Sequence, residues 1–214
     1  MNPLTRGRVA AIILAAGRSQ RMGRLKPLLP FGEKPLLARV IETLVTAQNI
    51  SPIFVVTGHA AQEIAAAVGE YNIRLVHNAN YAAGEMLSSV QAGVRALPAD
   101  CAAFFLVLGD QPMVQPETFR ALLSAWRQSD APLVAPTFEG RRGHPVLFSS
   151  RCAADILALP VGETLKTVVA RYAAQRREVP VSDPAILADV DTPEDYARAL
   201  RLWQDQTEQY GSGE

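Results

Sequence analysis

The sequence predicts an α/β protein built on a mostly parallel sheet with helices on both faces. Short apolar runs alternate with amphipathic helical patterns along the chain, which is typical of strand–helix–strand units. The run at 102–108 holds seven apolar residues without alternation, as expected for a strand buried on both faces. No linker or internal repeat divides the 214 residues, which suffice for one domain with a sizeable core.

The expected elements follow one another closely. Strands are expected at 9–14, 53–56, 73–76, 102–108, 132–136 and near residue 179, and helices at 36–47, 60–68, 86–97, 116–127, 151–159 and 165–175. The segment 137–148, which contains Gly140 and Gly143, is typical of a hairpin. Thr192 as N-cap followed by Pro193 predicts a last helix. The polar residues 204–214 predict a disordered tail after a domain spanning 1–203.

Charge and composition argue against several classes of protein. Lysine plus arginine total 21, as do aspartate plus glutamate, so no basic excess supports binding to nucleic acid or to a membrane surface. The first apolar run is far shorter than the ~20 residues needed to cross a bilayer. Cys101 and Cys152 have no metal-ligand spacing and are interpreted as reduced core thiols. These features predict a cytoplasmic protein.

The loop after the first expected strand is suited to binding phosphates. Ala15, Ala16 and Gly17 are small enough for a close backbone approach, and their N–H groups can form an anion-binding nest. Arg21 and Lys26 add fixed positive charge. The spacing matches neither a P-loop nor a dinucleotide-binding fingerprint. On composition alone, a surface loop with solvated charges is the alternative.

Two acidic segments are candidates for a metal site. Asp110 follows the 102–108 strand and precedes a proline turn, a position from which a carboxylate can hold a hard cation. Asp189 and Asp191 precede the last expected helix, and we expect only one of them to face inward. The alternative interpretation is a turn residue for Asp110 and helix capping for the second segment, which Thr192 already explains.

Two further segments contain polar groups near strand ends. Arg141, Arg142 and His144 lie in the expected hairpin, which could equally be a solvated turn. The segment 78–93 places Ser88 and Ser89 near a helix N-terminus, where they could donate to a nucleotide or simply cap the helix.

A longer motif connects these features. The run L-A-A-G-x-S-x-R-M-G-x-x-K-x-L-L-P from Leu14 to Pro30 resembles the signature loop of the MobA-like NTP transferases, and within them the molybdenum cofactor cytidylyltransferases. The resemblance extends over 9–200. It implies a single-domain, three-layer α/β/α fold with a Rossmann-like sheet, as in the nucleotide-diphospho-sugar transferases.

The resemblance also implies roles for individual residues. It implies catalytic roles for Arg21, Lys26 and Asp110, and metal binding by Asp110 and Asp191, with Asp189 as a lesser candidate. The residues that it implies for nucleotide binding are Leu14, Ala15, Ala16, Gly17, Arg21, Lys26, Asn78, Gly84, Ser89 and Asp110. Those that it implies for acceptor binding are Arg142 and His144, through a Gly-His-Pro segment.

The reaction implied is Mg²⁺-dependent transfer of CMP from CTP to the phosphate of molybdopterin, giving molybdopterin cytosine dinucleotide and pyrophosphate. Relatives that use GTP carry glycine where this chain has Ala16, and a methyl group there should hinder a purine more than a pyrimidine. Tyr81 stands where many relatives have tryptophan. A molybdenum hydroxylase or its chaperone is the implied protein partner.

Three other functions compete with this one. The same chemistry could use GTP, or act on a sugar or alcohol phosphate. The protein could instead be a non-catalytic maturation factor for a molybdenum hydroxylase, or a nucleotide-binding regulator. Paired carboxylates argue against the last, because binding alone does not require them. Pyrophosphate release from a given NTP distinguishes the enzymatic functions from the others.

Overall fold

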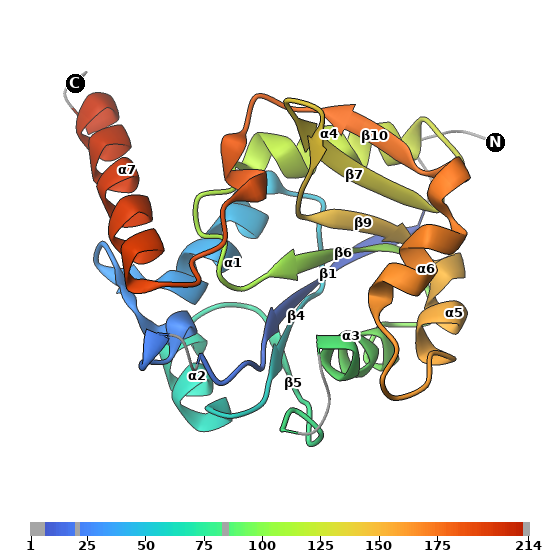
Figure 1. Ribbon diagram of the computed structural model, residues 1–214, viewed down its shortest axis with the longest axis horizontal. Coiled ribbons are helices and arrows are strands. Elements are labelled where there is room, and N and C mark those ends of the chain that lie inside the picture. The colour runs from blue at the N-terminus through green and yellow to red at the C-terminus, as the bar shows by residue number, and fades with distance from the viewer. Residues whose placement is uncertain (1–6, 20–21, 83–85, 212–214) are drawn as a thin grey trace.

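The protein folds around one twisted sheet. The computed structural model describes residues 7–19, 22–82 and 86–211 (Figure 1). Its main sheet has eight strands in the order β10-β7-β9-β6-β1-β4-β5, with β8 paired to β7. The strands are β1 (Arg8–Ala15), β4 (Ile53–Thr57), β5 (Arg74–His77), β6 (Cys101–Leu108), β7 (Leu133–Phe138), β8 (Arg141–Arg142), β9 (Val146–Ser149) and β10 (Arg177–Pro180).

The strands run mostly parallel, as the sequence predicts. β1 pairs in parallel with β4 and β6, and β4 with β5. β9 is antiparallel to both β6 and β7, and β10 is parallel to β7. The carboxyl ends of β1, β4 and β6 therefore meet at one edge of the sheet, where α/β proteins of this kind bind ligands.

Helices cover both faces of the sheet. They are α1 (Leu36–Ala47), α2 (Ala61–Val68), α3 (Met86–Arg95), α4 (Pro116–Arg127), α5 (Ala153–Leu157), α6 (Leu165–Arg171) and α7 (Pro193–Gly211). Short 3-10 helices are η3 (Lys26–Leu28), η4 (Ser150–Cys152), η5 (Ala173–Gln175) and η6 (Pro184–Leu187). A small separate hairpin pairs β2 (Pro30–Phe31) with β3 (Lys34–Pro35).

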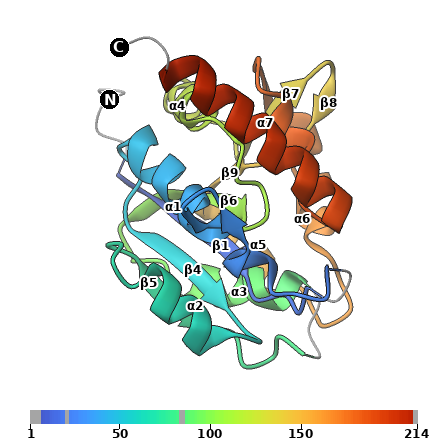
Figure 2. The ribbon, with the colours of Figure 1, turned by 90° about the vertical axis from the view of Figure 1, so that its left-hand side faces the viewer.

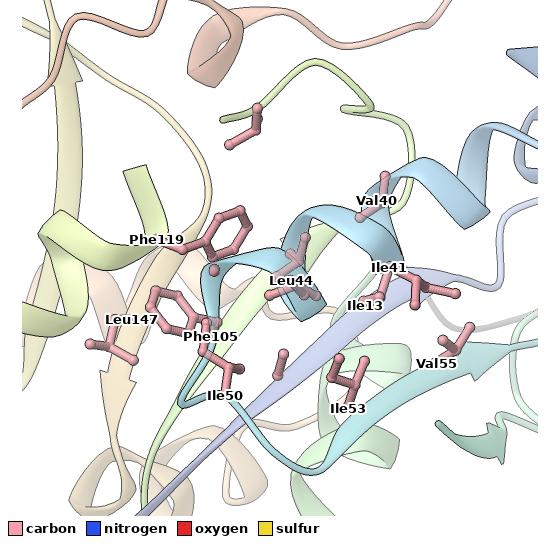
Figure 3. Packing of buried hydrophobic residues seen from close by; sticks show 14 of the residues in the cluster. Ile13, Val40, Ile41, Leu44, Ile50, Ile53, Val55, Phe105, Phe119 and Leu147 are labelled. Carbon is pink, nitrogen blue, oxygen red and sulfur yellow. The ribbon is translucent and has the colours of Figure 1, made fainter. Parts of the chain in front are cut away.

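Two apolar layers hold the helices to the sheet. Side chains alternate along β6, so Phe105 packs in the layer with α1, α2 and α4, whereas Phe104 packs in the layer with α3, α5 and α6. Figure 3 shows part of the first layer, in which the rings of Phe105 and Phe119 lie against each other and Ile13 lies beside Ile41. Each such fully buried side chain stabilises the fold by about 1.5–3 kcal/mol. The architecture is the three-layer α/β/α sandwich that the sequence predicts.

The segment 137–148 forms the expected hairpin, because β8 and β9 both pair antiparallel with β7, and β9 also pairs with β6 on its other side. The structure differs from the sequence-based expectation in two places. The helices expected at 151–159 and 165–175 are each divided into a 3-10 and an α-helical part. The disordered tail expected from Gln204 is wrong as far as Gly211, where α7 ends.

The start of α7 follows the sequence prediction. The hydroxyl of Thr192 accepts a hydrogen bond from the main-chain N–H of Asp195 at 3.1 Å, and the Asp195 carboxylate accepts one from the N–H of Thr192 at 3.1 Å. This reciprocal pair is a capping box. α7 then runs along one side of the molecule (Figures 1 and 2). Among the described residues, no helix combines the length and apolar character needed to cross a membrane.

Candidate active site

A pocket of about 640 Å³ opens at the carboxyl ends of β1 and β6. Its lining combines the loop after β1, the start of α3, the turn after β6 and the segment that precedes α7. The lining residues are Leu14, Ala15, Ala16, Gly17, Arg18, Ser19, Met22, Lys26, Pro27, Tyr81, Ala82, Met86, Ser89, Leu108, Gly109, Asp110, Asp189 and Asp191.

The loop after β1 is held in shape by its own polar groups. The Ser19 hydroxyl accepts a hydrogen bond from the main-chain N–H of Lys26 at 3.0 Å, and the Ser19 carbonyl accepts one from Met22 at 3.0 Å. Ser19 has φ of 52°, in the left-handed region. Gly17 has open space around its Cα. The loop thus bends back toward Lys26 and presents small residues to the pocket.

Gly109 brings the turn after β6 directly against this loop. Its N–H donates to the Leu14 carbonyl at 3.1 Å, and a Cβ at residue 109 would lie 2.6 Å from that oxygen. Real Cβ atoms do not approach backbone so closely. Glycine is therefore required where the two loops meet, and Asp110 is placed beside the expected phosphate loop.

Lys26 joins the two acidic segments. Its Nζ donates to Asp110 Oδ2 at 2.7 Å and to Asp191 Oδ1 at 2.8 Å. Burial on its own lowers the pKa of the Lys26 ammonium, but hydrogen bonds and charge attraction to both carboxylates outweigh burial and raise the pKa above its ordinary value of 10.5. The three side chains therefore form one charged cluster inside the pocket.

Both aspartates of the last acidic segment face the pocket, so the expectation that only one does is wrong. Asp189 and Asp191 line the pocket, whereas Val190 between them is buried in the core. Residues two apart in an extended chain share a side, and the backbone of Val190 is fixed by a 3.0 Å hydrogen bond to the Asp110 carbonyl. Gln111 Nε2 donates to Asp189 Oδ1 at 2.8 Å.

Asp189 differs electrostatically from Asp191. The pKa of Asp189 is raised above its ordinary value of 3.8, mainly because the carboxyl group is partly buried and also because the charge of Asp110 lies nearby. The Gln111 hydrogen bond opposes this shift. Asp189 is therefore protonated more readily than an ordinary aspartate, and Asp191 is directly paired with the Lys26 ammonium.

Asp110 and Asp191 are suitably placed to hold one cation. Both carboxylates approach a single point, marked by the Lys26 ammonium nitrogen. Mg²⁺ is usually held by one or two carboxylates, with phosphate oxygens and waters completing its shell. Within the described ranges, no group of three or more His, Cys, Asp or Glu side chains is arranged for a metal ion. A two-carboxylate site shared with a bound phosphate fits these residues.

The Gly-His-Pro segment lies behind the acidic cluster rather than on the pocket wall. Among the described residues, the buried side-chain atom without a hydrogen-bond partner is His144 Nδ1. Burial lowers the pKa of His144 below its ordinary value of 6.5, against the opposing charges of Asp189 and Asp110. Arg142 is exposed, and its Nη1 faces Glu178 at 3.7 Å. Neither residue is in the pocket lining, and acceptor binding by them stays a prediction.

Asn78 has a different place from the one expected. Its side chain is 4% exposed and outside the pocket lining, and its Nδ2 donates to the hydroxyls of Ser88 and Ser89 at 2.9 and 3.0 Å. Asn78 therefore ties β5 to the first turn of α3. Ser89 does line the pocket. Gly84 and Arg21, expected to bind the nucleotide, lie outside the described residues.

Tyr81 is a pocket residue to which the sequence assigned no role. Its ring lies 6.0 Å from that of His59 and 6.5 Å from that of His77, and the Arg18 guanidinium lies 5.7 Å from its centroid. A Cβ on Gly58 would come within 2.6 Å of Tyr81. Gln111 was also missed, although its position directly after Asp110 was a usable signal.

Comparison with known proteins agrees with this geometry. A family model described as the MobA-like NTP transferase domain matches residues 11–207. The chain belongs to this family. It is a nucleotidyltransferase of the MobA-like type, and its pocket lies at the ends of β1 and β6.

Known proteins resemble this chain in sequence and in structure. The chain is 31% identical over 192 residues, 89% of this chain and 95% of the relative, to "Molybdenum cofactor cytidylyltransferase" of Escherichia coli strain K12. The crystal structure of Rv0371c from Mycobacterium tuberculosis H37Rv superimposes with a TM-score of 0.79 at 27% identity, covering 92% of this chain and all of that one. The chain spans 51% of one bifunctional GlmU protein and 25% of another.

A second solved structure supports the fold alone. "4-diphosphocytidyl-2C-methyl-D-erythritolsynthase" from Anaerococcus prevotii has a TM-score of 0.77 at 18% identity, covering 95% of this chain and 99% of that one. The fold of this chain is therefore shared with a protein of that different name.

Proposed function

We propose that this protein transfers CMP from CTP to the phosphate of molybdopterin, forming molybdopterin cytosine dinucleotide and pyrophosphate. The observation that carries the proposal is the convergence of Lys26, Asp110 and Asp191 beside the loop after β1. A cation, two carboxylates and a backbone cradle are the groups needed to position a triphosphate and offset its developing charge.

The choice of substrates rests on relatives and on one residue. The Escherichia coli relative is named for the transfer of a cytidylyl group to molybdenum cofactor, and it aligns over 95% of its length. Ala16 lines the pocket and is 6% exposed, so its methyl group takes up room beside the loop backbone. The smaller space that remains beside the loop backbone favours cytosine over the larger guanine.

The reaction replaces one phosphoanhydride bond by another. An oxygen of the acceptor phosphate forms a bond to the α-phosphorus of CTP, while the bond from that phosphorus to the β-phosphate bridging oxygen breaks. The electron pair of the broken bond leaves with pyrophosphate. Because the acceptor oxygen is already anionic, the protein need supply no nucleophile or general base. Its contribution is to align the two phosphates and to offset charge.

Each residue of the cluster then has a role. The N–H groups of the loop that contains Ala15, Ala16 and Gly17 face the β- and γ-phosphates, and Lys26 offsets the charge that builds up on pyrophosphate. We assign the same role to Arg21. Asp110 and Asp191 would hold Mg²⁺, which supplies Lewis-acid polarisation of the α-phosphate when bound. A structure of Rv0371c from Mycobacterium tuberculosis, 25% identical, is a complex with manganese.

The acceptor is proposed to approach from the side of Asp189 and the Gly-His-Pro segment, where His144 and Arg142 remain the candidates for contacting it. Asp189 lines the pocket next to the cluster, and His144 lies within the electrostatic range of its carboxylate. The dinucleotide product is expected to pass to a molybdenum hydroxylase or to its chaperone.

A panel of nucleotides tests the proposal. Purified protein with Mg²⁺ and molybdopterin is incubated with CTP, GTP, ATP or UTP, and pyrophosphate is measured. We expect release with CTP only when molybdopterin is present, and faster GTP use by Ala16→Gly than by the unchanged protein. Release with a sugar phosphate in place of molybdopterin would assign another acceptor. No release with any NTP would contradict the proposal.

A further inference from the structure

In the proposed function Lys26 contacts the triphosphate, and Asp110 and Asp191 hold a cation. In the structure the three side chains are paired with one another instead. The Lys26 ammonium lies between the two carboxylates, at 2.7 and 2.8 Å. Offsetting pyrophosphate charge requires the ammonium to face the triphosphate, and holding a cation requires the same region of the carboxylates. The ammonium must therefore change partners when substrates bind.

We propose that Lys26 is an exchangeable internal counter-ion, which blocks the cation site until a nucleotide triphosphate draws its ammonium away. The proposal rests on the proposed function and adds to it a rule for binding: the divalent cation and the nucleotide bind interdependently, and the cation alone binds weakly.

The electrostatics of the ligand-free pocket favour this arrangement. Asp110 and Asp191 would repel each other if no cation lay between them, and their side chains are 24% and 31% exposed, so water screens the repulsion only in part. The Lys26 ammonium removes that repulsion with two short charge-assisted hydrogen bonds. A divalent cation that arrives alone must replace these bonds and separate the ammonium from both of these carboxylates.

The exchange needs movement of the side chain only. The main chain of Lys26 is fixed because its N–H donates to Ser19 Oγ at 3.0 Å and its carbonyl accepts from Leu29 at 3.1 Å. Pro27, the next residue, is buried. The Lys26 side chain lines the pocket beside the loop after β1, so a triphosphate on that loop offers the ammonium a new anionic partner within the same cavity.

Direct metal binding tests the proposal without turnover. Mn²⁺ alone is titrated into the protein, and free Mn²⁺ is followed by electron paramagnetic resonance. Lys26→Met and Lys26→Gln remove the counter-ion, Lys26→Arg retains its charge, and Lys166→Met removes an equal charge from an exposed site on α6 outside the pocket lining. Thermal melting establishes that each variant is folded.

We expect Lys26→Met and Lys26→Gln to bind Mn²⁺ alone about tenfold more tightly than the unchanged protein, as for a typical coupling between sites. Lys26→Arg and Lys166→Met should bind Mn²⁺ as the unchanged protein does. In a second titration with α,β-methylene-CTP, which cannot release pyrophosphate, the unchanged protein should bind Mn²⁺ and the analogue cooperatively. Lys26→Met should lose most of that cooperativity and bind the analogue more weakly.

Two results would overturn the proposal, and they have different meanings for the proposed function. If folded Lys26→Met and Lys26→Gln bind Mn²⁺ no more tightly than the unchanged protein, the counter-ion role is wrong, while pyrophosphate release from CTP can still establish the enzyme. If no variant binds Mn²⁺ with or without the analogue, both the counter-ion role and the proposed carboxylate metal site fail.

Discussion

Asp110 connects three parts of the candidate site through separate atoms. Its Oδ2 accepts from Lys26, and its main-chain carbonyl accepts from the N–H of Val190 at 3.0 Å. Gly109, its neighbour, is bonded to the loop after β1. A substitution that keeps the backbone unchanged therefore separates the charge of Asp110 from its structural contacts.

Asp110→Asn is predicted to lower CTP-dependent pyrophosphate release by at least about 100-fold, because it removes one of the two charges that would hold the cation. The amide occupies the same volume, so the melting temperature should change little. Asp100→Asn, at the opposite end of β6 and 63% exposed, is the matched control and should keep full activity. Near-normal turnover by Asp110→Asn would remove Asp110 from the mechanism.

His144 is predicted to make the fold less stable in acid. Burial lowers its pKa below 6.5 in the folded state, so the unfolded chain takes up this proton at a higher pH. The contribution of neutral His144 is fully present above pH 6.5 and is lost as the pH falls toward the folded-state pKa. Urea unfolding from about pH 7.5 to about pH 5.5 should show a smaller loss of stability for His144→Gln. An equal loss in both proteins would contradict the prediction.

At the residue scale, the sequence predicts where chemistry lies better than it predicts how each side chain points. Lys26, Asp110 and Asp191 could be selected from motifs and strand ends, and the structure brings them together. Asn78 also follows a strand, but its amide turns inward to two serines. The direction of that side chain depends on packing between β5 and α3, which one sequence does not reveal.

The irregular segment between η6 and α7 carries Asp189 and Asp191, so its position determines where these two carboxylates lie. Asp183 is buried and fixes its start, because its carboxylate accepts hydrogen bonds from the N–H of Gln115 and the hydroxyl of Thr118, both at 2.8 Å. Further along, the Ile186 carbonyl accepts from the His144 N–H at 3.0 Å. The segment that carries Asp189 and Asp191 is thus held from the start of α4 and from the Gly-His-Pro segment.

Gly143→Ala is predicted to displace this segment. A Cβ at residue 143 would lie 2.1 Å from the Ile186 carbonyl oxygen, so backbone must move. We expect a loss of about 1–3 kcal/mol in the free energy of unfolding, measured in urea, together with reduced pyrophosphate release. Gly17→Ala is the control for stability, since no atom lies within 4 Å of its added Cβ. Unchanged stability in Gly143→Ala would mean that the contact relaxes freely.

The pairing of elements was predicted only in part. Apolar runs identify β1, β4 and β6 because strands buried on both faces leave a clear signal. The hairpin expected at 137–148 is confirmed, since β8 and β9 pair antiparallel with β7. The second partner of β9 was not predicted, because β9 pairs with β6 from Ala103 to Leu106, about 40 residues earlier in the sequence, and such a distant pairing leaves no local signal.

At the scale of the whole molecule, α7 is attached through a few large side chains. The Trp203 ring lies 5.7 Å from that of Phe31, and the Arg39 guanidinium lies 4.8 Å from the Trp203 ring. A Cβ on Gly32 would come within 2.2 Å of Trp203. The polar composition of 204–211 suggested a disordered tail. Composition does not reveal that Trp203, just before these residues, packs the helix against the β2–β3 hairpin.

Trp203→Ala is predicted to destabilise the protein by about 2–4 kcal/mol, because a large aromatic surface loses its partners. Leu202→Ala, at a residue that is 51% exposed on the same helix, should change stability by less than about 0.5 kcal/mol. Chemical unfolding of the two variants gives the comparison. Similar values for both would show that α7 does not depend on Trp203 for its attachment.

The Lys26 bridge also has a consequence for how this protein is made. Its two acidic members come from segments separated by 84 and 165 positions from the lysine, and Asp191 lies shortly before α7. A ribosome therefore adds Asp191 long after Lys26 and Asp110. A nascent or prematurely terminated chain that ends before Asp191 lacks the second acid, so the complete charge cluster forms only after that residue has been synthesised.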